Sequence, residues 1–286
     1  MEDGEYLKLA LGFGIGIVVA ILNSIAGGGS SISLPSFILM GIPAGVANGT
    51  NRFGLIWGNL ASFYGLYRRG YFSWKILAPL VLPILLGAGA GAWCAVLIPD
   101  TIFQLFLAAV LIGVALLNVQ YLWRNHKKLK SNSQVKSGVL TPQVTHAAGN
   151  IHGEQNYPIA PRPQLSFWSF VGFVLVGFYG GFIQVGMGFV LIFAFSLLAP
   201  MRLVQINALK SAIATLFMIQ SFAIFFYYGK VQWDLAIIYA MGCVLGGFIG
   251  SLIQISQGDS FIRIAMVLIS VVMAIKILAN MMQIII

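Results

Sequence analysis

Ten apolar runs constrain the fold of this chain more than any other feature. They lie at about 7–26, 30–41, 46–67, 74–97 and 102–123, and then at about 166–184, 186–199, 204–228, 234–255 and 260–283. Several have roughly 20 residues, enough for a helix to cross a hydrocarbon core of about 30 Å. Because the runs are continuously apolar rather than alternating, a transmembrane β-barrel is excluded. The pattern predicts an all-α polytopic membrane protein.

Composition agrees with this prediction. Charged residues make up 8% of the 286 residues, against about 25% in soluble domains. So few charges cannot cover a water-facing surface, which excludes a water-soluble enzyme. No acidic residue lies deep in an apolar run, which disfavours a carboxylate proton relay and an acid-lined cation path. The seven acids are at chain ends, in turns or in a polar stretch: Glu2, Asp3, Glu5, Asp100, Glu154, Asp234 and Asp259.

A polar stretch at 124–165 separates the first five runs from the last five. It contains all three histidines and six of the sixteen basic residues. Such a composition cannot bury a core, so we expect a flexible linker. Cytoplasmic loops gather Lys and Arg, so topology explains the net charge of +9 better than nucleic-acid binding does. We expect no nucleic-acid partner, no cofactor, and no metal at the irregularly spaced histidines.

The two sets of runs match when the sequence is shifted by 159 positions, the distance from Gly27 to Gly186. The matching residues are glycines, polar residues and turn residues, whereas chance identity would scatter over apolar positions. We therefore predict an internal duplication with repeats at 1–123 and 166–286. The matching pairs include Gly27 with Gly186, Gly29 with Gly188, Asn48 with Asn207, Gly70 with Gly229, and Trp74 with Trp233.

Charge then predicts the orientation of the segments. Arg68, Arg69 and Lys75 flank the turn between the third and fourth segments, so this turn and the basic linker belong in the cytoplasm. Counting the crossings places the N- and C-termini outside. Five segments per repeat is an odd number, so the second repeat must run opposite to the first. This inverted topology is typical of secondary transporters, and we expect a plasma membrane location, the inner membrane in a bacterium.

The second segment of each repeat is too short to cross the bilayer. At 12 to 14 residues, segments 30–41 and 186–199 would extend about 18–21 Å as helices. Glycines precede both and allow a sharp turn, so we expect two half-helices that begin near the bilayer midplane. Their first N–H groups, near Ser30, Ser31, Phe189 and Val190, are expected to lack partners within the helix and to form an anion site. The alternative is that the glycines serve only close helix packing.

Each third segment carries a cation about 9 Å into its helix. These cations are Arg52 and Lys210, and the shift of 159 places Lys210 on Asn51, next to Arg52. With no acid in the apolar runs, they need an anion from elsewhere, and a transported substrate would supply it. The alternative is that each side chain snorkels to the headgroups. The polar residues expected around them are Asn23, Ser24, Asn48, Thr50, Gln184, Gln205 and Asn207.

Several motifs of the first repeat carry a family resemblance: Ala26-Gly-Gly-Gly-Ser30, Leu34-Pro35, Gly41-Ile-Pro43, Ala47-Asn-Gly-Thr50, and Tyr67-Arg-Arg-Gly70 before Trp74. In these motifs the chain resembles the TauE/SafE sulfite exporter family. The resemblance implies export of a sulfur-containing anion such as sulfite, thiosulfate or an organosulfonate like sulfoacetate. It maps the family's glycine-rich turn onto Gly27–Gly29 and its polar segment start onto Asn48–Arg52, with a weaker copy at Gln205–Lys210.

The expected function is therefore a secondary transporter that exports a small sulfur anion by alternating access. An anion channel that uses the same site is the alternative. A membrane-embedded enzyme is disfavoured, because the runs contain no His or Cys cluster and no carboxylate pair for acid–base chemistry. The predicted substrate-binding residues are Asn23, Ser24, Gly27, Gly28, Gly29, Ser30, Ser31, Asn48, Thr50, Asn51, Arg52, Gln184, Gly186, Gly188, Asn207 and Lys210.

Overall fold

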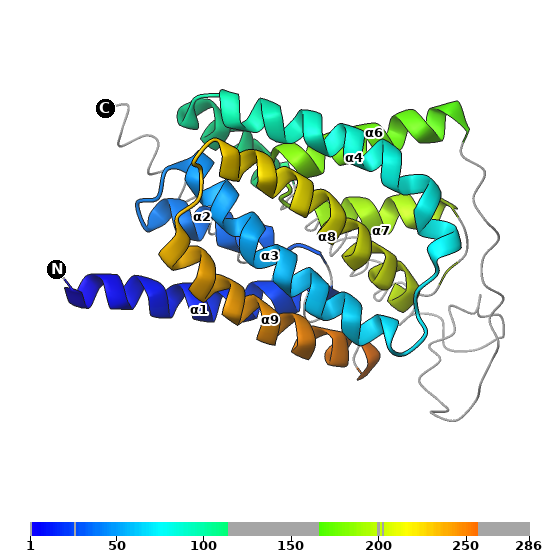
Figure 1. Cartoon of the computed structure of the whole chain (residues 1–286), viewed down its shortest axis with the longest axis horizontal. Helices are drawn as coiled ribbons and strands as arrows, with labels where there is room; N and C mark the ends of the chain where they lie inside the picture. The colour runs from blue at the N-terminus through cyan, green and yellow to red at the C-terminus, as the bar shows by residue number, and fades with distance from the viewer. Residues whose placement is uncertain (1, 26, 114–165, 199–200, 202, 257–286) are drawn as a thin grey trace, which may run out of the picture.

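The computed structural model describes residues 2–25, 27–113, 166–198, 201 and 203–256, which are helical and contain no strand. A helix without a label covers Asp100–Gly113. The predicted linker at 124–165 and the predicted last run at 260–283 lie outside the described residues. The labelled helices in Figure 1 are α1 (Glu2–Ile25), α2 (Ser30–Leu39), α3 (Ala44–Tyr67), α4 (Trp74–Leu97), α6 (Phe167–Phe182), α7 (Met187–Leu198), α8 (Leu203–Tyr227) and α9 (Trp233–Ser256).

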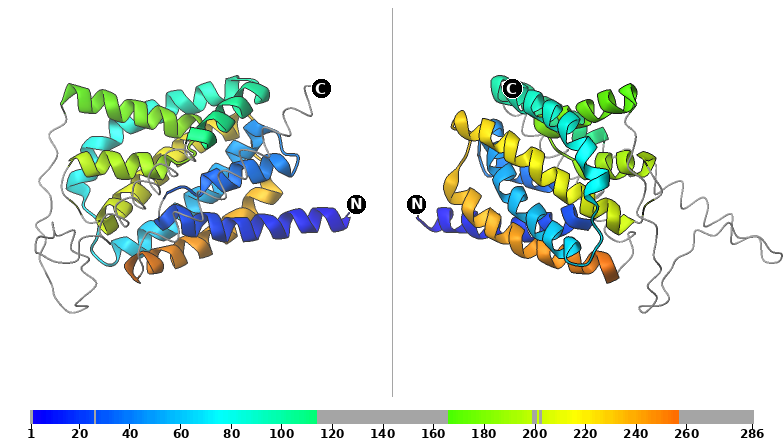
Figure 2. Two further views of the ribbon diagram at one scale, coloured as in Figure 1. Left: turned by 180° about the vertical axis from the view of Figure 1, so that it is seen from behind. Right: turned by 45° about the vertical axis from the view of Figure 1, so that its right-hand side comes forward.

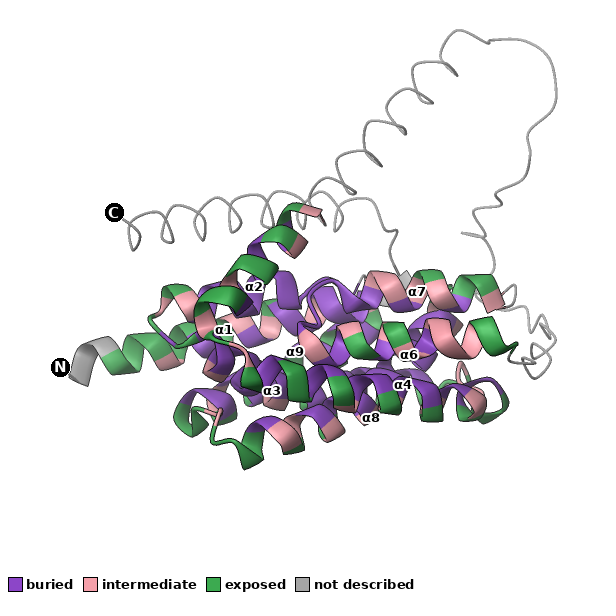
Figure 3. Cartoon of the chain, turned by 90° about the horizontal axis from the view of Figure 1, so that it is seen from above, coloured by how far each residue is buried: buried purple, intermediate pink, exposed green. Residues whose placement is uncertain are grey.

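Four of the described helices are long and apolar enough to cross a membrane: α1, α4, α8 and α9. The 24 residues of α3 would also span about 36 Å, although its first half is polar. Buried residues run along the centre of the molecule, and exposed ones lie on the outer helix faces (Figure 3). Those faces carry large apolar side chains such as Phe193, which is 66% exposed. The prediction of an all-α, multi-pass membrane protein is confirmed.

The second segments are short, as the sequence predicts. The α2 helix has 10 residues and α7 has 12, so each extends only about 15–18 Å. By contrast, α1 begins at Glu2, earlier than the predicted start near residue 7. An acidic first turn is compatible with a helix because the N-terminal end of the helix dipole is positive.

The two parts of the chain are interleaved. The α1 helix packs along α9, and α6 packs along α4, so the first helix of each part lies against the fourth helix of the other (Figures 1 and 2). Between them α3 packs on α8, α3 also touches α9, and α8 also touches α4. If each helix is replaced by the helix at the same place in the other part, the same set of pairings results.

Matched glycines also adopt matched backbone conformations. Gly27 and Gly186 have φ angles of 78° and 68°, and Gly70 and Gly229 have φ angles of 77° and 65°. Both pairs are separated by the 159 positions found in the sequence. The left-handed region is easily reached only without a Cβ, which explains glycine at these four turns.

Candidate functional site

The joints between the first and second helices of the two parts cross at the centre of the bundle. The α1–α2 joint (Gly27–Gly29) and the α6–α7 joint (Ile183–Gly186) meet where the N–H of Gly188 donates to the carbonyl of Gly27 over 3.0 Å. A Cβ added to Gly188 would lie 2.0 Å from the Cα of Gly27. Only glycine permits this approach, so close packing accounts for these two glycines.

Near the start of each half-helix an N–H group donates to the turn that precedes the helix. The N–H of Ser31 donates to the carbonyl of Gly28 and that of Phe189 to the carbonyl of Gly186, each over 3.0 Å. Both acceptors lie in the turn just before the helix, where the chain turns tightly enough for hydrogen bonds between residues three apart. The positive ends of the two helix dipoles still lie at these joints.

Arg52 is fully buried against the C-terminal end of α6. Its guanidinium donates to the carbonyls of Gly180 (3.3 Å), Gly181 and Phe182 (3.4 Å). The ring of Phe225 lies beneath it, 4.8 Å from the guanidinium carbon to the ring centroid. Carbonyls at a helix C-terminus carry partial negative charge, so they stabilise this cation. Since the side chain is 0% exposed, it does not snorkel.

Lys210 holds the end of α1 in the same way. Its ammonium donates to the carbonyls of Asn23 (2.8 Å) and Ser24 (3.0 Å), and the residue is 2% exposed. Asn23 is 159 positions before Phe182, one of the carbonyls that Arg52 holds. Each buried cation therefore binds the C-terminal end of the first helix of the other part, α6 for Arg52 and α1 for Lys210. The sequence predicted the two cations but not their carbonyl partners.

A matched pair of asparagines binds the same two joints. The side-chain amide of Asn48 donates to the carbonyl of Phe182 over 3.0 Å, and that of Asn207 donates to the carbonyl of Ile25 over 3.4 Å. A carbonyl only accepts, so the amide nitrogen must face it and the Oδ1 atom faces away. Both Oδ1 atoms are buried without a donor.

A small cavity lies between the two parts beside the crossing. Its volume is about 10 Å³, which leaves room for about one water molecule. Gln184 lines it, is 1% exposed, and has no partner for either polar side-chain atom. Its φ of 49° is uncommon for a residue with a Cβ. The lining residues are Asn23, Ser30, Asn59, Gln184, Met187, Gly188, Leu191, Lys210, Ala214, Phe217 and Met218.

Five predicted site residues thus line one cavity: Asn23, Ser30, Gln184, Gly188 and Lys210. Asn59 also lines it and was not predicted. Its amide accepts a hydrogen bond from Asn23 (3.0 Å) and lies 3.3 Å from the sulfur of Met218. Asn59 and Met218 are themselves 159 positions apart. An asparagine in the apolar second half of a spanning run is a signal that would have identified this residue.

The other predicted residues lie outside the lining of this cavity. Thr50 accepts from the N–H of Gln232 and Asn51 from the hydroxyl of Tyr239, each over 2.9 Å. Ser31 is buried with an unpaired hydroxyl. The remaining predicted residues have been described above, either at the two joints or as the buried arginine and the matched asparagines. They are Ser24, Gly27, Gly28, Gly29, Asn48, Arg52, Gly186 and Asn207.

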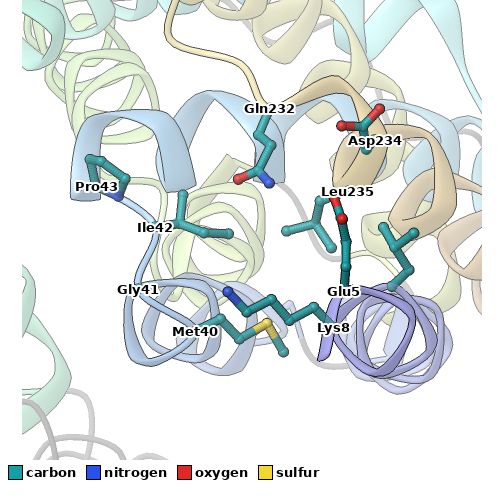
Figure 4. Close-up of a pocket in the computed structure, with 10 residues that line it drawn as sticks. Glu5, Lys8, Met40, Gly41, Ile42, Pro43, Gln232, Asp234 and Leu235 are labelled. Carbon is teal, nitrogen blue, oxygen red and sulfur yellow. The ribbon is translucent and has the colours of Figure 1, made fainter. Parts of the chain in front are cut away.

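A larger cavity of about 500 Å³ opens at the end of the bundle where α1 begins (Figure 4). Glu5 and Lys8 of α1, Gln232 and Asp234 contribute its polar side chains, together with the segment between α2 and α3. Nothing in the sequence predicted this cavity. Asp234 lies 159 positions after Lys75, so the equivalent place in the first part of the chain carries the opposite charge.

The fold and the site define a class of protein: multi-pass membrane proteins in which broken helices meet at the centre, as they do in many transporters. The chain belongs to the TauE/SafE family, since the family model "Sulfite exporter TauE/SafE" matches residues 12–277. It is therefore a member of a membrane transporter family. Among the described residues no three His, Cys, Asp or Glu side chains group as metal ligands would.

Similar proteins cover almost the whole chain. A probable membrane transporter protein of a Sinorhizobium species, ORF9, is 27% identical over 98% of this chain and 96% of its own length. A probable membrane transporter protein of Haemophilus influenzae is 24% identical over 94% and 93%. The probable membrane transporter protein YfcA of Escherichia coli K12 is 23% identical over 95% and 90%. No solved structure matches the chain.

Proposed function

We propose that this protein is a secondary transporter that exports a small sulfur-containing anion across the plasma membrane, the inner membrane of a bacterium. Sulfite, thiosulfate and organosulfonates such as sulfoacetate are the candidate substrates. The observation that carries the proposal is the central cavity, where Lys210, Gln184 and Ser30 meet beside the positive ends of α2 and α7. Membership of the TauE/SafE family supports it.

The architecture we propose is an inverted duplication, with repeats 1–123 and 166–286 joined by a cytoplasmic linker at 124–165 and with both termini outside. Helix pairings that survive exchange of the two parts support it. The matched φ angles of the turn glycines and the contact between Asn59 and Met218 add to that support. Residues at equivalent positions meet in this way when an axis of approximate two-fold symmetry passes between them.

The electrostatics of the cavity favour an anion. Its lining includes one charged side chain, the ammonium of Lys210, and no carboxylate. The two helix N-termini beside the cavity, and Arg52 outside its lining, add positive potential. We propose that the anion lies between α2 and α7 with Lys210, Gln184 and Ser30 in direct contact, and that Arg52 acts by its charge.

Alternating access fits the closed core better than an open pore. A cavity with room for about one water must widen before a sulfur oxyanion enters. In the described residues a backbone hydrogen bond, Gly188 to Gly27, joins the two parts where they cross, and we propose that they rock about this contact. We place the outer mouth of the path at the cavity of Figure 4. Export of an anion would draw on the membrane potential, about 2.3 kcal/mol per charge per 100 mV.

The test uses purified protein in liposomes preloaded with sulfite, thiosulfate or sulfoacetate. We expect saturable efflux that grows as the inside is made more negative, and counterflow when anion is supplied on both sides. Lys210→Gln should abolish this flux, while Lys75→Gln, at an exposed lysine outside both cavities, should retain it. Absence of flux for all three anions would overturn the proposal, and flux without saturation or counterflow would identify a channel.

A further inference from the structure

The buried polar atoms around the crossing include acceptors that an ordinary anion cannot satisfy. The carbonyls of Phe182 and Ile25 fix the amides of Asn48 and Asn207, so each Oδ1 is left without a donor. The Oε1 atom of Gln184 is a third such acceptor, and Gln184 is one of the residues that line the cavity. Asn48 and Asn207 lie outside the lining of the cavity, whereas Gln184 lies in it. Buried acceptors nearly always find a donor, and for the Gln184 oxygen a ligand in the cavity can supply it.

A fully deprotonated oxyanion has lone pairs and no hydrogen to give. Against the Oε1 of Gln184 it would place acceptor against acceptor, which leaves both unsatisfied and costs free energy. A ligand that carries an O–H group alongside its negative charge satisfies both kinds of atom. The charge would meet Lys210 and the amide nitrogen of Gln184, and the O–H would meet the Gln184 oxygen.

The charge lining the cavity argues for a single negative charge on that ligand. Lys210 is the charged residue of the lining. The Arg52 guanidinium is bound to three carbonyls at the end of α6 and is absent from the lining. One ammonium at the ligand balances one negative charge, and a second buried charge would be left without a contact partner.

We infer that the site takes a sulfur monoanion that also donates a hydrogen bond, such as hydrogen sulfite or a hydroxyalkylsulfonate, and discriminates against the dianion. This inference rests on the proposed function and names its substrate class. Hydrogen sulfite crosses as one unit with no bond broken, and its proton leaves to water outside. The proton therefore travels on the substrate, and the transport path needs no carboxylate relay.

A matched pair of ligands tests the hydroxyl. Ethanesulfonate and 2-hydroxyethanesulfonate both carry one negative charge at all working pH values and differ by one O–H group. We expect the hydroxyl compound to compete for sulfite efflux about tenfold more tightly, the effect of one satisfied buried acceptor. Equal competition by the two sulfonates would overturn the inference.

The pH dependence of sulfite flux tests the charge. With equal pH on both sides and a fixed potential, efflux at constant total sulfite should fall about tenfold per pH unit above the second ionisation of sulfurous acid. Efflux of 2-hydroxyethanesulfonate, whose charge is constant, should change little and serves as the control. Sulfite efflux that rises with the dianion would contradict the inference.

Gln184→Met keeps the side-chain volume and removes the acceptor. Both polar atoms of Gln184 lack protein partners, so the exchange breaks no internal hydrogen bond and the variant should fold. The preference for the hydroxyl sulfonate should drop severalfold, and an unchanged preference would count against the assigned contact. Flux of no anion in the wild type would overturn the proposed function, whereas intact flux without hydroxyl preference would overturn this inference alone.

Discussion

The ends of α1 and α6 present the same problem and solve it with different cations. Both helices end in the core, where residues of their last turn, such as Ser24 and Gly181, are buried. Arg52 engages three carbonyls at the end of α6 and stacks on Phe225. Lys210 engages two carbonyls at the end of α1 and also lines the central cavity.

The difference separates a structural cation from one that is placed to meet substrate. The planar guanidinium fork matches several acceptors at once, whereas the ammonium is a compact charge with three donors. Arg52 donates to its three carbonyls and is not among the residues that line the cavity. Lys210 combines a helix-end contact with exposure to the cavity, so changes at the two positions should have different consequences.

The largest effect is expected where the two ends meet, at Gly188. A Cβ there would lie 2.0 Å from the Cα of Gly27, so Gly188→Ala should prevent the two parts from packing. Gly172→Ala is the control, because a Cβ at Gly172 meets nothing within 4 Å. This substitution removes the conformational cost of a helical glycine, about 1 kcal/mol, so the control should not lose stability. Yield of monodisperse protein and thermal unfolding in detergent measure both. Equal stability of the two variants would contradict the close contact.

Arg52→Gln should give the next largest loss of stability. The three carbonyls that Arg52 holds would lose a charged donor, at a cost of about 3 kcal/mol in the free energy of unfolding. Arg68→Gln is the matched control, since Arg68 is exposed at the end of α3 and bonds only Tyr64 in the described structure; we expect a change within about 0.5 kcal/mol. Thermal unfolding of both variants measures the two losses of stability, and similar losses would contradict the prediction.

Lys210→Gln should cost less stability and more function. A glutamine amide can still donate to the carbonyl of Asn23, so we expect a loss of about 1–2 kcal/mol. Stabilisation of the folded protein by added sulfite should disappear, because the charge facing the cavity is gone. Lys75→Gln, at an exposed lysine, should keep that stabilisation. If Lys210→Gln unfolds as readily as Arg52→Gln yet still responds to sulfite, the contrast between the two cations is wrong.

The smallest effects are expected at the matched asparagines. Asn48→Ala and Asn207→Ala each remove one hydrogen bond from a side-chain amide to a backbone carbonyl at a joint, worth about 1 kcal/mol. The Asn48 bond is shorter, 3.0 Å against 3.4 Å, so Asn48→Ala should cost more. Urea or thermal unfolding of the two variants side by side gives the order, and the reverse order would show that the joints differ in some other respect.

Much of the fold was predictable because its signals are local. The length of an apolar run decides whether a helix spans the bilayer, and the brevity of α2 and α7 is visible in the sequence. Five of the sixteen predicted site residues line the cavity. The acceptors that the N–H groups of Ser31 and Phe189 find in the preceding turns could not be predicted, since the turn geometry depends on φ and ψ rather than on residue type.

Sequence by itself determined that this chain is helical, apolar and internally matched, and that two cations lie within its membrane segments. Tertiary structure decided what those cations touch. Arg52 and the carbonyl of Gly180 are 128 residues apart, and Lys210 and that of Asn23 are 187 apart. Backbone carbonyls are present at every residue and leave no mark in the sequence. Only the crossing of two broken helices shows which of them need a positive charge, and which cation is left facing the cavity.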